Sequence, residues 1–142
     1  MIERPWLRAA LVYAFLVNAV VGVWATFSPR AFYDDFPGLG RVWVAVDGPF
    51  NEHLVRDTGS WALALAVLCA VAAWTLGRTI VVTAGVALAV QAVPHAVYHL
   101  RHTDPFDGTD LALSIGGIVA VASVGVAIAA AGIATPRAAS AR

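Results

Sequence analysis

Four long apolar runs alternate with short polar segments along the chain. The runs lie at about residues 7–27, 54–76, 79–100 and 109–131. Each has about the 20 residues that a helix needs to cross the hydrocarbon core of a bilayer. The pattern predicts an all-α protein, a four-helix transmembrane bundle that forms a single integral membrane domain over residues 1–142.

The first run has the basic start and apolar core of a secretory signal. Its core is longer than a signal core, however, and no A-x-A cleavage site precedes Ser28 and Pro29. We therefore predict a retained helix. Residues 28–48 follow as a long loop whose Pro and Gly residues exclude a continuous helix.

The polar ends of the later runs predict helix caps. The second helix is expected to begin near Pro49, with Asp47 or Gly48 as its cap. Asp107 is a candidate N-cap of the fourth helix, and Asp110 lies in its first turn, where capping alone explains both acids. Small residues on the fourth helix predict close helix packing: Gly116, Gly117, Ala120, Gly125 and Ala129.

Four spans place both termini on one side of the membrane. That side holds five arginines and the opposite side four, while the opposite side carries every carboxylate except Glu3. The arginine split predicts cytoplasmic termini and a long first outer loop. Basic residues that are all arginine, with many Ala, Val and Gly, suggest a high-GC bacterium and hence a multi-pass protein of its cytoplasmic (inner) membrane.

Composition agrees with a membrane protein and excludes other classes. Hydrophobic residues make up 60% of the chain and charged residues 13%, with a mean hydropathy of +0.77. The net charge of zero gives no basic face for nucleic acid. Cys69 is the single cysteine, so neither an intramolecular disulfide nor a thiolate metal cluster is expected.

Three of the four histidines lie at the end of the third run. They are spaced H-x-x-x-H-x-x-H as His95, His99 and His102. On a helix this spacing places them on one face, with Gln91 one turn earlier. Pro94 is expected to bend the helix just before them.

The second helix opens on a dense group of ionisable residues. Glu52 and Arg56 are spaced i,i+4 for an ion pair, and so are His53 and Asp57. A carboxylate one turn from an imidazole can fix its tautomer, as carboxylates do behind metal-bound histidine. The same residues also fit a helix start that only satisfies its own charges.

The leading hypothesis is a divalent metal site at the extracytoplasmic face. His95 and His99 would supply two ligands, and His102, His53 or Asp57 would complete the set. Zinc is the first candidate, with iron or manganese as alternatives, and an open position would give hydrolytic or redox chemistry. No enzyme class is assigned. Supporting positions are Glu52, Arg56, Gln91, Tyr98 and Asp104.

Two other interpretations fit the same residues. Haem would be held axially by His53 and either His95 or His99, although its surroundings would be acidic and interfacial. A non-catalytic accessory or scaffold subunit would use the His and Asp cluster as a structural or pH-sensitive element. The expected partners are the lipid bilayer and either a homo-oligomer or a larger membrane complex.

Three stretches carry a family resemblance: FYDDFPG at 32–38, DGPFNEHLVRD at 47–57 and PHAVYHLRH at 94–102. With the four-run layout, the chain resembles small uncharacterised bacterial four-helix membrane proteins of DoxX-like organisation. The resemblance implies the four-helix fold and no particular reaction.

Overall fold

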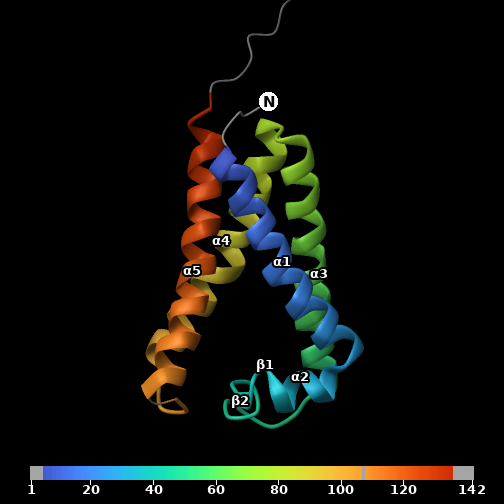
Figure 1. Cartoon of the computed structure of the whole chain (residues 1–142), viewed down its shortest axis with the longest axis vertical. Coiled ribbons are helices and arrows are strands. Elements are labelled where there is room, and N and C mark those ends of the chain that lie inside the picture. The colour runs from blue at the N-terminus through green and yellow to red at the C-terminus, as the bar shows by residue number, and fades with distance from the viewer. Residues whose placement is uncertain (1–4, 107, 136–142) are drawn as a thin grey trace, which may run out of the picture.

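The structure, a computed structural model, describes residues 5–106 and 108–135. Its four long helices are α1 (Pro5–Phe27), α3 (Glu52–Thr75), α4 (Arg78–Arg101) and α5 (Gly108–Ile133) (Figure 1). Each is long and apolar enough to cross a membrane, so the chain is a multi-pass membrane protein. The predicted all-α bundle is confirmed, and each helix begins and ends within two residues of its predicted span.

The bundle is built from two tightly packed helix pairs. α1 packs on α3 (the first pair) and α4 packs on α5 (the second pair). Glycines form the closest approaches: a Cβ on Gly59 would lie 2.6 Å from the backbone nitrogen of Thr26, and one on Gly125 would lie 2.9 Å from that of Ala89. Small residues let membrane helices approach backbone to backbone, which maximises dispersion contacts where no hydrophobic effect drives association.

The two pairs share a core only at one end. That end, near Pro5 and Ile133, is called the terminal end, and the opposite end the loop end. The core at the terminal end takes residues from all four long helices: Leu7, Leu11, Ala14, Cys69, Ala72, Ala73, Leu76, Val81, Ala84, Leu88, Ile128 and Ala131. Cys69 is fully buried there, as apolar packing predicts.

Toward the loop end the pairs diverge, as Figure 1 shows. Each pair has its own core cluster there. Ala25, Phe32 and Val55 belong to the first pair and its loop, whereas the second pair uses Ala92, Ala96 and Ala122. Packing therefore joins the pairs at the terminal end, while other contacts must connect them at the loop end.

The predicted long first loop contains regular structure. Residues 29–35 form the short helix α2 (Pro29–Asp35), with Pro29 in its first turn, where a missing N–H costs nothing. The strands β1 (Pro37–Gly38) and β2 (Arg41–Val42) pair antiparallel as a hairpin. Phe32 of α2 is buried against α1, where its ring meets that of Trp24 edge-on. Aromatic packing thus fixes the loop to the first pair.

The start of α3 differs from the prediction. α3 begins at Glu52 rather than near Pro49, and its cap is Asn51, whose side-chain oxygen accepts a hydrogen bond from the Leu54 N–H at 3.1 Å. Asn is among the best N-caps, so the expectation of Asp47 or Gly48 was wrong. Asp107, the expected cap of the fourth helix, lies outside the described residues.

The predicted packing stripe of α5 is only partly used. Gly125 and Ala129 contact α4, in agreement with the prediction. Gly116 and Gly117 lie nearer the loop end, where an added Cβ would meet nothing within 4 Å, and Ala120 is exposed. The stripe fails there because α5 has no helix against these positions.

The hairpin turn places Leu39 in an unfavourable conformation. Leu39 and Gly40 link the strands with φ of 59° and 75°, the positive values of a type I′ turn, and Leu39 is fully exposed. This left-handed backbone conformation is about 1 kcal/mol or more less favourable for a residue with a side chain than for glycine, and the penalty is smaller for Asn. We expect Leu39→Asn to raise hydrogen-exchange protection of the Trp43 amide about fivefold, and Leu39→Val to lower it. Equal protection in both variants would contradict this.

Candidate functional site: a histidine pair at the loop end of α4

The predicted histidine face is present on α4. Val81 and Leu88 are buried in the shared core, and His95 follows Leu88 after the same seven-residue interval. Seven residues are close to two helical turns, so His95 continues the inward face of α4 beyond the point where the shared core ends. Gln91 and His95 are exposed on this part of the helix.

The imidazoles of His95 and His99 are neighbours. Their ring centroids lie 4.8 Å apart with the ring planes at 60°. The Nδ1 atom of His99 is buried and has no hydrogen-bond partner among the described residues. A buried imidazole nitrogen without a partner is unusual, because native structures satisfy most such groups. In the tautomer that carries its proton on Nε2, this nitrogen is able to accept a metal or a proton.

His102 is engaged locally instead. Its Nδ1 lies 2.8 Å from the Tyr98 carbonyl oxygen, and its ring stacks on that of Tyr98 at 4.2 Å. The backbone contact leaves only Nε2 available. Tyr98 also meets His99 edge-on at 5.3 Å, so it packs between the two histidines. Asp104 follows in the turn after α4 and is exposed.

The opening of α3 satisfies its own charges. Arg56 Nε donates to Glu52 at 2.9 Å, and the same guanidinium donates to the Thr26 carbonyl oxygen at the end of α1. His53 Nε2 lies 3.2 Å from Asp57, with the His53 side chain 87% exposed. Both predicted i,i+4 pairs are therefore present. Exposed pairs of this kind are screened by solvent and contribute little.

The structure does not bring the α3 and α4 residues into one cluster. His53 and Asp57 start a helix of the first pair, whereas His95 and His99 belong to the second, and Figure 1 shows these helix ends apart. Within residues 5–106 and 108–135, no group of three or more His, Cys, Asp or Glu residues is placed to hold a metal ion. The metal-donor groups that lie next to each other are the imidazoles of His95 and His99.

Asp47 is a residue that the sequence interpretation assigned to another role. Since Asn51 caps α3, Asp47 is released from capping. It is exposed in the loop after β2. The signal in the sequence was Asn51, a preferred N-cap residue directly before Glu52.

Two other carboxylates are committed elsewhere. Asp34 accepts two hydrogen bonds from Arg30, at 2.7 and 2.9 Å, and this hydrogen bond and its charge raise the pKa of the Arg30 guanidinium. Asp110 accepts from Arg41 and from Trp43 through one oxygen, at 2.6 and 2.7 Å. Sequence reasoning gave Asp110 only a position in the first turn of its helix, because a contact 69 residues apart leaves no local pattern.

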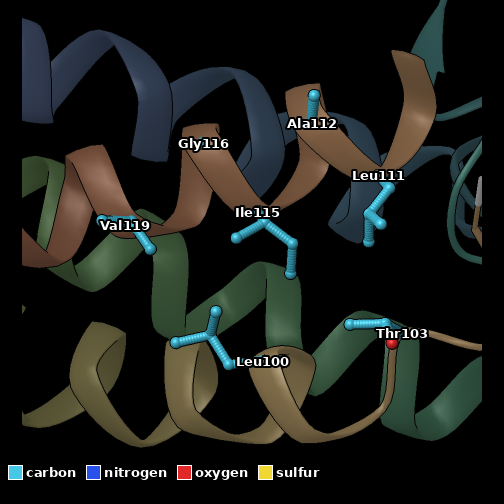
Figure 2. A pocket seen from close by; sticks show the side chains of 7 residues that line it. All are labelled: Leu100, Thr103, Leu111, Ala112, Ile115, Gly116 and Val119. Carbon is cyan, nitrogen blue, oxygen red and sulfur yellow. The ribbon is translucent and has the colours of Figure 1, made fainter. Parts of the chain in front are cut away.

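A groove between α4 and α5 lies near the histidines but differs in chemistry. It is lined by Leu100, Thr103, Leu111, Ala112, Ile115, Gly116 and Val119. In Figure 2 the side chains of Ile115 and Leu100 extend toward each other across it. The lining contains no ionisable group, so the groove supplies no metal ligand. Its apolar walls suit hydrocarbon.

Fold and site define a class: a four-span membrane protein of two helix pairs with a histidine pair near one end. The sequence matches no protein-family model, and searches of curated proteins and of solved structures find no match either. No family is therefore assigned, and the DoxX-like resemblance is carried by layout alone.

Proposed function

We propose that this protein binds a divalent metal ion at the extracytoplasmic face of a bacterial inner membrane, through His95 and His99. The observation that carries the proposal is the neighbouring pair of imidazoles with the buried, unpartnered Nδ1 of His99. Two histidines one turn apart are a common bidentate support for zinc, iron or manganese. Zinc is the first candidate.

The remaining positions would be filled by a third side chain and by water. Asp47 is one candidate for the third ligand, but among the described residues it forms no metal-holding group with the histidine pair, so its loop would have to move toward them. His102 offers Nε2 from the same helix. His53 and Asp57 would reach the histidine pair only if the loop ends of the two helix pairs approached each other. A site with two or three protein ligands leaves water on the metal, which lowers the pKa of that water and supports hydrolytic chemistry.

Two alternatives have less support. Axial haem ligation by His53 with His95 or His99 needs residues of different helix pairs that diverge at this end. A scaffold role is supported by the self-satisfied pairs at the start of α3, which need no ligand. The scaffold role gives the unpartnered nitrogen of His99 no partner, and the haem alternative would use it only together with a ligand from the other helix pair.

Elemental analysis of purified protein tests the proposal. Protein loaded with zinc and then washed free of excess metal is expected to keep about one ion per chain, as a single site requires. Retention of no stoichiometric zinc, iron or manganese would overturn the proposal. An absorption spectrum with a Soret band would instead establish the haem alternative.

A further inference from the structure

The loop-end hairpin joins the two helix pairs through a single carboxylate. Asp110 belongs to α5 and therefore to the second pair. Arg41 Nη1 and Trp43 Nε1 both donate to its Oδ1 atom, at 2.6 and 2.7 Å. Within the described residues, these are the only hydrogen bonds that connect the first pair and its loop to the second pair.

The donors themselves are held firmly on the first pair. The Trp43 N–H donates to the Phe36 carbonyl at 2.8 Å, and the two rings meet edge-on at 6.1 Å. Phe36 in turn packs with the core cluster of Ala25, Phe32 and Val55. The hairpin is thus an extension of the first pair that reaches across to the second.

The contact is stronger than an ordinary surface ion pair. The Arg41 and Asp110 side chains are only 32% and 37% exposed, and one acceptor oxygen receives a charged and a neutral donor. Charge-assisted hydrogen bonds are the strong class, and partial burial reduces their screening. The Tyr33 hydroxyl fixes the following loop by donating to the Gly48 carbonyl oxygen.

The pairs themselves supply little else to hold this end together. Their common core lies at the terminal end, and each has a separate cluster at the loop end. We infer that residues 37–43 act as a releasable strap, which sets the separation of the two helix pairs at the loop end through Arg41, Trp43 and Asp110. When the strap lets go of Asp110, the two helix pairs could rotate relative to each other, with the shared core at the terminal end as the hinge. The inference does not depend on bound metal.

Spin-label distance measurements in lipid nanodiscs test the strap. Labels at Thr58 on α3 and Leu113 on α5, both exposed, report the loop end in a Cys69→Ala background. Asp110→Ala, which removes the acceptor of both bonds, is expected to lengthen the mean separation and broaden its distribution. Labels at Thr75 and Ile133 report the terminal end, where the distribution is expected to stay as in the parent.

The matched control is a substitution of Asp34. As Asp34→Ala, it removes the same charge and two arginine hydrogen bonds, but inside α2 rather than between the pairs, so the separation should not change. Trp43→Phe removes one of the two strap bonds while keeping an aromatic ring against Phe36, and a smaller lengthening is expected. An unchanged loop-end distribution in both Asp110→Ala and Trp43→Phe, or the same lengthening in Asp34→Ala, would overturn the strap.

Discussion

Gly85→Ala is expected to be among the most destabilising single-methyl changes in this protein. A Cβ at Gly85 would overlap the backbone of α5, with the Ala129 Cα only 2.7 Å away and the carbonyl carbon of Ile128 2.9 Å away. No flexible side chain is present to move aside, so α4 and α5 must separate. Overpacking of this kind costs about 3 kcal/mol at the upper end of the usual range. Denaturant titration followed by circular dichroism measures the loss.

Gly117→Ala is the matched control for this change. It adds the same methyl group to α5 at a position where a Cβ meets nothing within 4 Å. Because Ala favours a helix over Gly by up to about 1 kcal/mol, the control is expected to be neutral or slightly stabilising. If both variants unfolded at the same denaturant concentration, the close contact of α4 with α5 would be refuted.

The sequence predicted the helices well because their determinants are local. Length and apolar content define a span, and each helix lies within two residues of its predicted apolar run, although the start of α3 was also expected near Pro49. The i,i+4 pairs of Glu52 with Arg56 and His53 with Asp57 were equally readable, since helical geometry alone creates them.

The arrangement of the helices was not predictable in the same way. Hydropathy indicates that Gly116 and Gly125 belong to one apolar helix. It does not indicate that Gly116 faces open space while Gly125 lies against the backbone of Ala89. The sequence also suggested that the start of α3 and the end of α4 meet. Whether they do depends on the divergence of the two pairs, a tertiary property that no local pattern encodes.

The candidate site was predicted in part for the same reason. His95 and His99 share a helix, and their proximity follows from the sequence. The roles of Asp47 and Asp110 depend on the path of the loop between α1 and α3, which is set by the Asn51 cap and by the packing of Phe32. Those residues had to be located in three dimensions before their partners were visible.

Replacing both His95 and His99 with Ala is expected to abolish metal retention. Loss of even an outer-shell partner weakens metal affinity about 10- to 100-fold, so removal of two direct ligands should weaken zinc binding by more than about 100-fold. Elemental analysis after washing, together with a competition titration against a chelator, measures the change. Circular dichroism should show an intact bundle, because His95 is exposed and His99 lies outside the shared core.

The control removes two imidazoles from elsewhere. His53→Ala with His102→Ala deletes the same number of nitrogen donors, one from an exposed ion pair and one already bonded to the Tyr98 carbonyl. Because neither belongs to the neighbouring pair, this variant should keep its metal and lose much less affinity than the variant that lacks both paired imidazoles. Equal loss in both double variants would assign the site to all four histidines together, which requires the loop ends of the two helix pairs to close. Full retention in His95→Ala with His99→Ala would remove the pair from the site altogether.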